Sequence, residues 1–278
     1  MKPNPTVSVC IPVYNGADYL NVAIDSVLRQ TYDDFELIIM DNCSTDESFE
    51  IARGFESQRV RVSRNRENLG MAGNWTRCLA AARGKYVKIL PADDFLYPDC
   101  LARQVAVFAA AGSEDPGRPL GIVACARDVV NDTGSRKFSM RFSQSGRRHG
   151  LAMIRNNVRR GINTLGPPGN VLFRTDLARA AGAFQDEYLF VVDLAFYFKV
   201  LLKSDVVMQP EVLTAFRVGT GSCTRQLAWK QAASFVGYVK AIRRDPVYGL
   251  SRFDLAACRC MATLNMIGRL LLTRFLLK

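Results

Sequence analysis

The sequence predicts an α/β protein whose mostly parallel central sheet is flanked by helices and followed by a helical C-terminal tail. Two observations predict this fold. Short β-rich apolar runs alternate with amphipathic helical stretches over the N-terminal third, and strands that alternate with helices form right-handed βαβ units. The chain has 278 residues, of which 49% are hydrophobic and 23% charged, so it is long enough to bury a large core.

The alternation begins at residue 7. A first strand is expected at 7–13, which is β-rich and ends at the turn residues Asn15 and Gly16. Apolar residues at helical spacing, among them Leu20 and Ile24, then predict a helix over 18–30. The pattern repeats to give strands at 35–40, 60–62 and 86–90 and helices at 47–55 and 71–83.

Polar and aromatic side chains follow three of these strands, at the sheet edge where parallel sheets bind ligands. They are Tyr14 and Asn15 after the first strand, Asp41 after the second, and Asp93 with Asp94 after the fourth. The first turn lacks the G-x-G-x-x-G pattern of dinucleotide sites, and the chain has no P-loop. Adjacent carboxylates can hold a divalent cation that binds a diphosphate; alternatively, Asp93 and Asp94 cap the next helix.

The chain is strongly basic, with 37 Lys and Arg against 26 Asp and Glu and a net charge of +11. Such a surface attracts polyanions. The eight cysteines form no C-x-x-C pair, so we expect reduced, mostly buried thiols and no cysteine metal site. The polar N-terminal residues show no signal-peptide pattern, which predicts a cytoplasmic protein.

Five ordered motifs carry a family resemblance. They are VCIPVYN at 9–15, SVLRQTY at 26–32, FELIIMDNCSTD at 35–46, NLG at 68–70, and a segment from GKYV at 84–87 to ADD at 92–94. In this order the chain resembles the family-two glycosyltransferases of the GT-A fold, closely over 6–110 and more loosely to about 225. The resemblance implies a nucleotide-sugar-binding half at 1–115, an acceptor-binding half of the same domain at 116–225, and a C-terminal helical segment at 226–278.

The resemblance further implies an inverting hexosyltransferase of cell-surface polysaccharide synthesis. Its donor would be a nucleotide sugar, a UDP-sugar by default, and its acceptor a glycan or a polyprenyl-diphosphate-linked sugar. Tyr14 would stack on the base, and Asp41 would hydrogen-bond the base or ribose. Asp93 would contact the ribose or the metal, and Asp94 would ligate Mn²⁺ or Mg²⁺ on the diphosphate. The expected donor site also includes Pro12, Asn15 and Asn68.

Three positions depart from the family pattern. Pro91 stands where many relatives have an additional Asp, and Val192 replaces the first member of a catalytic acid pair. Gly219 stands where many relatives have a metal-binding His, while the single histidine, His149, lies outside that motif. These departures keep open a catalytically degenerate member of the fold that only binds nucleotides or anions.

The second half is expected to choose the acceptor. Residues 184–198 resemble the family's acceptor segment and keep the second acid of the pair, Asp193. An inverting transfer needs one base for the acceptor hydroxyl, and apolar neighbours would raise the pKa of Asp193 and strengthen it as a base. Asp193 is therefore the expected base, with Asp186 and Glu187 as alternatives. The structural alternative for Asp193 is a helix N-cap before Leu194.

Two further segments bear on partners. Residues 133–175 contain nine Arg or Lys and no Asp or Glu, so they either hold a lipid-linked diphosphate or anionic glycan, or form a solvated loop. Residues 265–278 have a broad apolar face with interspersed Arg and Lys. This stretch is too short and too charged to span a bilayer. It either lies in a membrane interface, at the inner face of the plasma membrane, or packs on the domain.

Two other functional classes fit the sequence less well. A nucleotidyltransferase shares the sheet and the metal carboxylates, but it would carry a Gly-rich loop with a basic residue after the first strand. A nucleic-acid-binding protein would show a recognisable binding module. Neither feature occurs, so we expect no nucleic-acid partner.

Overall fold

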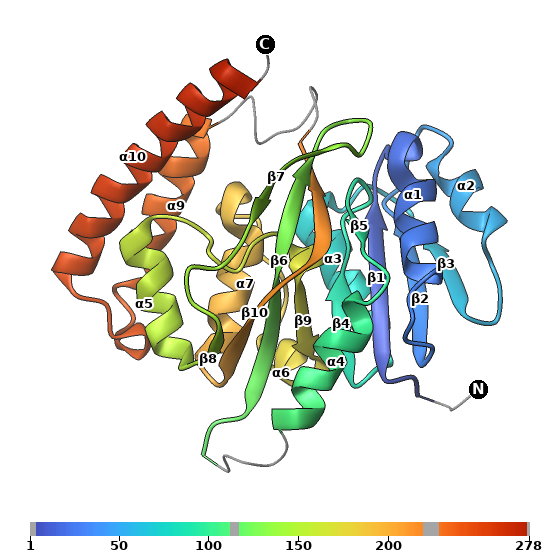
Figure 1. Cartoon of the computed structure of the whole chain (residues 1–278), viewed down its shortest axis with the longest axis horizontal. Coiled ribbons are helices and arrows are strands. Elements are labelled where there is room, and N and C mark those ends of the chain that lie inside the picture. Colours follow the sequence, from blue (N-terminus) through green and yellow to red (C-terminus); the bar gives the residue numbers. More distant parts are fainter. Residues whose placement is uncertain (1–3, 112–116, 219–227, 277–278) are drawn as a thin grey trace.

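The computed structural model describes residues 4–111, 117–218 and 228–276. These residues form a ten-stranded sheet with the order β3-β2-β1-β4-β9-β6-β10-β5, in which β7 pairs with β6 and β8 with β10 (Figure 1). The strands are β1 (Val7–Val13), β2 (Phe35–Asp41), β3 (Val60–Arg64), β4 (Tyr86–Ile89), β5 (Phe95–Leu96), β6 (Leu120–Val130), β7 (Arg136–Met140), β8 (Gly146–Arg148), β9 (Val171–Arg174) and β10 (Asp205–Arg217).

The strand directions confirm the predicted mostly parallel sheet. β1 runs parallel to β2 and β4, β2 to β3, and β6 to β10. β9 lies antiparallel between β4 and β6, so β4 and β6 point the same way. The carboxyl ends of β1, β2, β4, β6 and β10 therefore lie at one edge of the sheet.

The helices complete the alternation that the sequence predicts. They are α1 (Ala17–Leu28), α2 (Ser48–Gly54), α3 (Gly70–Ala81), α4 (Cys100–Ala111), α5 (Gly150–Arg160), α6 (Thr175–Ala180), α7 (Val192–Leu201), α9 (Ala228–Ile242) and α10 (Arg252–Leu276). Short 3-10 turns lie at Pro168–Asn170, Leu189–Val191 and Pro246–Tyr248. The first helix begins and ends within two residues of the predicted range.

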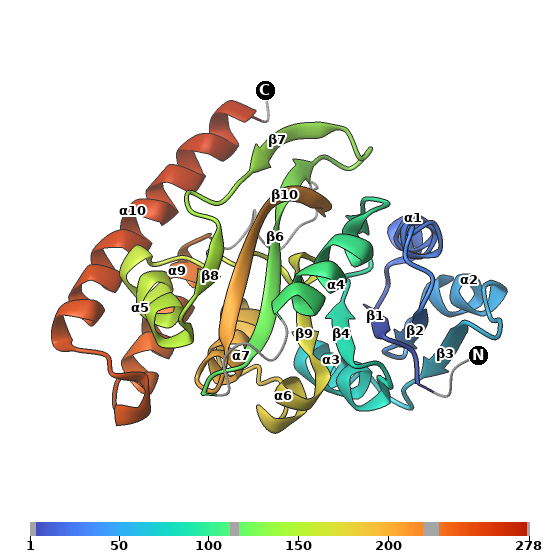
Figure 2. The same cartoon turned by 60° about the horizontal axis from the view of Figure 1, so that its bottom comes forward.

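Each face of the sheet carries its own hydrophobic core, because alternate side chains of a strand point to opposite faces. In β1, Val9 and Ile11 join the core formed with α1, α2 and α4, whereas Cys10 joins the core formed with α3, α6 and α7. Figure 2 shows α1 and α4 on one side of the sheet and α3 and α6 on the other. Two covered faces leave the strand ends as the place for a site.

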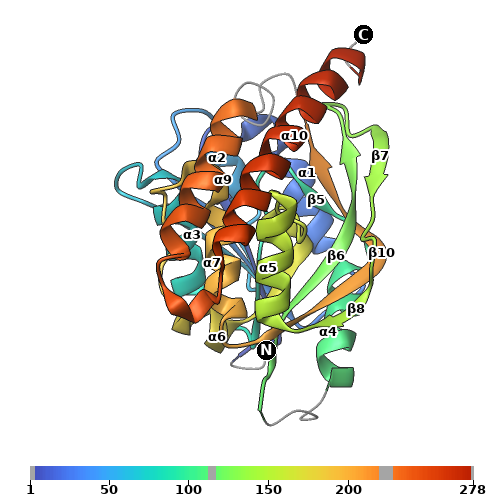
Figure 3. The ribbon, with the colours of Figure 1, turned by 90° about the vertical axis from the view of Figure 1, so that its left-hand side faces the viewer.

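The C-terminal helices pack beside α5 (Figure 3), at the end of the sheet opposite β3 (Figure 1). α10 begins with a capping box, since Ser251 and Asp254 exchange hydrogen bonds between side chain and backbone N–H. Asn265 Nδ2 then donates to the carbonyl of Arg160 at 2.8 Å and ties α10 to α5. In the part of the chain that the structure covers, every helix is too short or too polar to cross a membrane.

The basic segment 133–175 is not the solvated loop that was one alternative for it. Its residues form β7, β8, α5 and β9. Three of its arginines, Arg147, Arg159 and Arg174, form ion pairs with Asp205, Asp254 and Asp176. The segment is ordered because its strands extend the sheet and α5 buries Met153, Ile154 and Val158.

Candidate active site

The strand ends bring the predicted donor residues to one edge of the sheet. Val13 at the end of β1 lies opposite Asp41 at the end of β2, and the N–H of Asn42 donates to the carbonyl of Val13 at 2.8 Å. At the end of β10, the N–H of Arg217 donates to Oδ1 of Asp94 at 2.9 Å. Backbone hydrogen bonding therefore joins the turn after β2 to the end of β1, and the turn after β4 to the end of β10.

A recess of about 270 Å³ lies beside the end of β1. Pro12, Tyr14, Asn42 and Asn68 line it together with Trp75. Tyr14 is 49% exposed, so it does not pack fully against the sheet, and its ring offers a face for stacking. The recess thus has the aromatic and amide groups that a nucleoside needs.

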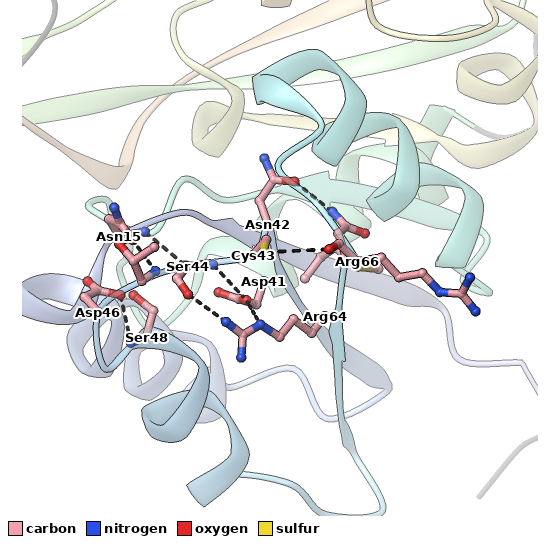
Figure 4. A network of polar contacts seen from close by, with 12 residues as sticks. Asn15, Asp41, Asn42, Cys43, Ser44, Asp46, Ser48, Arg64 and Arg66 are labelled. Carbon is pink, nitrogen blue, oxygen red and sulfur yellow. Dashed lines mark hydrogen bonds and ion pairs between the residues drawn. The ribbon is translucent and has the colours of Figure 1, made fainter.

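Asn15 connects two turns and does not line this recess. It adopts a left-handed conformation, with φ of 50°, which asparagine tolerates better than most residues. Its Oδ1 accepts from the N–H of Thr45 at 2.8 Å, and its own N–H donates to Ser44 Oγ at 3.0 Å. Asn15 therefore holds the loop after β1 against the loop after β2 (Figure 4).

Asp41 is fully buried at the centre of this polar network (Figure 4). Its Oδ2 accepts from the N–H of Ser44 and pairs with Arg64 Nε, both at 3.1 Å. Its Oδ1 is buried without a hydrogen-bond partner among the described residues. A buried acceptor costs free energy unless a donor satisfies it, so Oδ1 could accept from an N–H or O–H of a ligand, although Asp41 itself does not line the recess beside β1.

Asp93 and Asp94 precede the short strand β5, and α4 begins only at Cys100. The alternative that they cap the next helix is therefore wrong. Asp93 is exposed, whereas Asp94 is buried. Burial, and secondly the charge of Asp93, raise the pKa of the Asp94 carboxyl well above its ordinary value. Although Asp93 reaches solvent, the surrounding protein excludes enough water to raise its pKa as well.

Arg217 connects the turn that carries Asp93 and Asp94, here called the carboxylate turn, to the neighbouring strand ends. Its buried Nε donates to the carbonyl of Asp93 at 2.8 Å, and Nη1 donates to the carbonyls of Asn131 and Asp132 at 2.9 and 2.6 Å. The guanidinium also lies 4.4 Å from the centre of the Tyr19 ring. One side chain thus links the ends of β4, β6 and β10. The sequence analysis missed this role, although an arginine closing an apolar strand is a signal of it.

The carboxylate pair fits a divalent cation that a diphosphate also binds. Within the described ranges, no group of three or more His, Cys, Asp or Glu could hold a metal. Mg²⁺ commonly takes only one or two carboxylates and completes its shell with phosphate oxygens and water. Burial, and secondly the charge of Asp93, disfavour the ionised form of Asp94, and a bound cation would favour that form. Gly219, the departure from the histidine motif, lies outside the described residues.

Asp193 lies in the first turn of α7, whose N-cap is Val191. The alternative that Asp193 is itself the N-cap is therefore wrong. Its Oδ2 accepts from Asn163 Nδ2 at 2.8 Å, and its Oδ1 accepts from the N–H of Leu194 at 2.7 Å. Burial raises the pKa of the Asp193 carboxyl to about 6, against the opposing effect of these hydrogen bonds.

Arg127 connects the two carboxylate groups electrostatically. This β6 side chain lowers the pKa of both Asp94 and Asp193, and such an effect requires proximity to each. The sequence analysis missed Arg127 and Asn163. The signal for Arg127 was its place with Asp128 inside the otherwise apolar run 120–130.

Asp186 and Glu187, the alternative bases, lie on an exposed turn before α7. A Cβ on Gly70 would lie 3.9 Å from Asp186 Oδ2. Because Gly70 lines the recess beside Tyr14, Asp186 lies near the predicted donor side. Glu187 interacts with Tyr188 and raises the pKa of that phenol, after the larger effect of burial.

Comparisons with known proteins agree on one family. The family model described as "Glycosyl transferase family 2" matches residues 8–181. An uncharacterised protein of Mycobacterium tuberculosis is 31% identical over 223 residues, which is 77% of this chain and 67% of its own length. A Bacillus subtilis relative named as a teichuronic acid biosynthesis glycosyltransferase, TuaG, is 39% identical over 103 residues, 36% of this chain and 41% of its own.

Solved structures share the fold at low identity. Residues 1–349 of S. aureus TarS, in complex with UDP, superpose with a TM-score of 0.66 and 18% identity, covering 92% of this chain and 70% of that TarS chain. The mannosyltransferase PcManGT from Pyrobaculum calidifontis, in complex with GDP-Man and Mn²⁺, gives 0.62 and 18%, with 98% and 76% covered. Both are GT-A glycosyltransferases, and the likeness confirms the GT-A fold.

Proposed function

The chain belongs to glycosyl transferase family 2, and from this premise we propose that it transfers a sugar, with inversion, from a nucleoside-diphosphate donor to an acceptor hydroxyl. The acceptor is a glycan or a lipid-linked sugar of cell-surface polysaccharide synthesis, a role that the name of TuaG supports. The observation that carries the proposal is that segment 163–169 reaches both groups: Asn163 Nδ2 donates to Asp193 Oδ2 at 2.8 Å, and a Cβ on Gly169 would lie 3.9 Å from Asp94 Oδ2. Donor and acceptor chemistry therefore share one crevice.

On the donor side, the proposal assigns the nucleoside to the recess beside β1. Tyr14 stacks on the base, and the unsatisfied Oδ1 of Asp41 accepts a hydrogen bond from the base or ribose. Asp93 and Asp94 hold Mn²⁺ or Mg²⁺, which when bound neutralises the charge that develops on the departing diphosphate. Uridine is the default base, and the UDP complex of TarS supports that choice.

On the acceptor side, Asp193 acts as the general base. With a pKa of about 6 the carboxyl is largely ionised at neutral pH, yet it is more basic than an ordinary aspartate. Asn163 and the N–H of Leu194 hold its two oxygens in place. Asp193 takes the proton of the acceptor hydroxyl while the new C–O bond forms and the bond to the diphosphate breaks.

A membrane surface is a further proposed partner. Trp229 on α9 and Leu264 and Ile267 on α10 are exposed by 61%, 54% and 46%, and the chain carries a net charge of +11. Exposed apolar side chains together with positive charge favour anionic interfaces. Sedimentation with phosphatidylglycerol vesicles, but not with phosphatidylcholine vesicles, is the expected result; equal recovery in both supernatants contradicts it.

Nucleotide binding tests the proposed function. Calorimetry with UDP, GDP, dTDP and CMP, with and without Mn²⁺, should show metal-dependent tightening for one diphosphate. Asp94→Asn should lose this tightening, while Asp33→Asn, a control at an exposed aspartate beyond the opposite end of β2, should retain it. Equal nucleotide affinity with and without Mn²⁺ would overturn the metal role of Asp93 and Asp94. If none of the four nucleotides binds, the proposed transferase activity is refuted and the catalytically degenerate alternative is favoured.

A further inference from the structure

Among the described residues, two pairs of neighbouring thiols lie inside the molecule, one in each hydrophobic core. Cys10 of β1 and Cys78 of α3 form the first pair, and Cys100 of α4 and Cys125 of β6 form the second. All four side chains are fully buried and unlinked. Within each pair the two thiols share a hydrogen bond. The proposed sugar transfer uses neither pair.

A buried cation distinguishes the second pair from the first. Lys88 of β4 is fully buried, and its Nζ donates to the carbonyls of Gly169 and Val171 at 2.7 and 3.2 Å. No carboxylate of the described ranges forms an ion pair with this ammonium group. A buried ammonium is costly without a counter-charge. The charge of Lys88 acts on both Cys100 and Cys125, so a thiolate in this pair supplies the missing negative charge.

The two pairs therefore differ in how easily a thiol ionises. Although burial opposes ionisation, the hydrogen bond with Cys125 and the charge of Lys88 lower the pKa of the Cys100 thiol. In the first pair, the hydrogen bond with Cys78, burial and the charge of Glu36 raise the pKa of the Cys10 thiol well above its ordinary value. The thiolate is the form of cysteine that reacts with oxidants, so the charge distribution favours reaction at Cys100 over reaction at Cys10.

The second pair also supports the 3-10 turn beside Asp94. The Cys125 thiol donates to the carbonyl of Asn170 at 3.3 Å, and Lys88 holds the carbonyl of the preceding residue, Gly169. A Cβ on Gly169 would lie 3.9 Å from Asp94 Oδ2. A chemical change at this thiol pair therefore acts within one turn of the proposed metal site.

We propose that Cys100 and Cys125 form a peroxide-sensitive dithiol whose oxidation to a disulfide weakens nucleotide binding at the carboxylate turn. The Cys100 thiolate attacks one oxygen of hydrogen peroxide, so that an S–O bond forms, the O–O bond breaks and hydroxide leaves. The sulfur of Cys125 then attacks the sulfur of Cys100. The S–S bond forms, the S–O bond breaks, and the proton of Cys125 leaves with the oxygen as water. The two sulfurs together lose two electrons, which the peroxide gains.

Oxidation removes two supports of the turn beside Asp94. The sulfur of Cys125 no longer donates to the carbonyl of Asn170, and Lys88 loses its thiolate counter-charge. Peroxide reaches Cys100 through local opening at the start of α4, which directly follows the exposed residues 98–99. The disulfide does not depend on the proposed function, whereas its effect on nucleotide binding rests on that function.

Mass spectrometry of the full chain tests the dithiol. Native protein is treated with hydrogen peroxide, quenched with catalase, unfolded in N-ethylmaleimide and digested without reductant. We expect linked peptides that contain Cys100 and Cys125, while Cys10 and Cys78 are recovered as alkylated thiols. Cys125→Ser should instead accumulate the sulfenic acid of Cys100, which dimedone traps, and the matched control Cys78→Ser should form the same disulfide as wild type.

Two outcomes of this experiment would overturn the dithiol: no linkage between Cys100 and Cys125, or equal linkage in both thiol pairs. If Cys125→Ser fails to fold, the comparison of the two pairs in wild type carries the test.

Calorimetry with UDP and Mn²⁺ tests the effect on the donor site. Oxidised wild type should bind UDP about tenfold more weakly than reduced wild type, and dithiothreitol should restore the affinity. Peroxide should leave the UDP affinity of Cys100→Ser unchanged. Equal affinity of oxidised and reduced wild type would overturn the link between the dithiol and the donor site. If reduced wild type binds no UDP, the proposed function fails, while the linked peptides still support the dithiol.

Discussion

Replacement of Asp193 by Asn is expected to stabilise the protein at neutral pH while it removes turnover. The pKa of the Asp193 carboxyl rises from 3.8 to about 6 on folding, so the ionised form costs about 3 kcal/mol in the folded state. Asparagine carries no charge, but its single acceptor oxygen replaces only one of two hydrogen bonds, a loss of about 1 kcal/mol. The net gain of about 2 kcal/mol corresponds to a melting temperature about 4–8 °C higher.

The pH dependence identifies the cause of this gain. Because the pKa is higher in the folded chain than in the unfolded one, the penalty is absent below about pH 4, grows between about pH 4 and 6, and stays constant above that range. The melting temperatures of wild type and Asp193→Asn should therefore differ at about pH 7.5 and converge toward about pH 4. Asp33→Asn, at an exposed carboxylate, should show no such convergence.

Turnover is measured as nucleoside diphosphate released from the donor that binding selects, with a membrane extract as the source of acceptor. Loss of a general base lowers the rate by about 10²–10⁴-fold. A variant that melts below wild type at neutral pH would refute the argument from burial, since the carboxylate would then stabilise the fold. Unchanged turnover would exclude Asp193 as the base and favour Asp186, which lies closer to the donor recess.

Three further outcomes follow from the same geometry. In wild type, kcat/KM should fall about tenfold per pH unit below about pH 6 as Asp193 takes up a proton; a flat profile down to about pH 5 would contradict this role. Asp41→Asn should weaken nucleotide binding about tenfold in calorimetry, and unchanged affinity would show that its unsatisfied oxygen does not contact the ligand. Arg217→Met should lower the free energy of unfolding by about 3–5 kcal/mol in urea melts, because the carbonyls of Asp93, Asn131 and Asp132 lose their donor. A loss under about 1 kcal/mol would show that Arg217 does not hold these three carbonyls together.

The donor side of this crevice was predictable because its position follows from local order. Strands β1, β2 and β4 each consist of an apolar run that ends in polar residues, and parallel strands joined by helices place such ends at one edge. Tyr14, Asp41 and Asp94 are therefore assigned to that edge without knowledge of any long-range contact. The surroundings of Asp193 were predictable only in part: its apolar neighbours indicated a raised pKa, but its hydrogen-bond partner Asn163 was not foreseen.

The rest depends on contacts between residues that are distant in sequence. Arg217 binds Asp93 across 124 residues, and no pattern near either residue names the other. That contact exists because the two-residue strand β5, which directly follows Asp94, pairs antiparallel with Thr214 and Ala215 of β10. A run this short carries no signal of which strands it pairs with.

Binding of a diphosphate on the donor side should depend on metal. The donor side presents two carboxylates, and Arg217 beside them donates three N–H groups to backbone carbonyls. A diphosphate there meets negative charge unless a cation is bound between them. EDTA should therefore weaken UDP binding by about tenfold or more, measured by calorimetry before and after addition of the chelator. Equal UDP affinity with and without EDTA would mean that Arg and Lys side chains, and not a cation at Asp93 and Asp94, compensate the charge of the diphosphate.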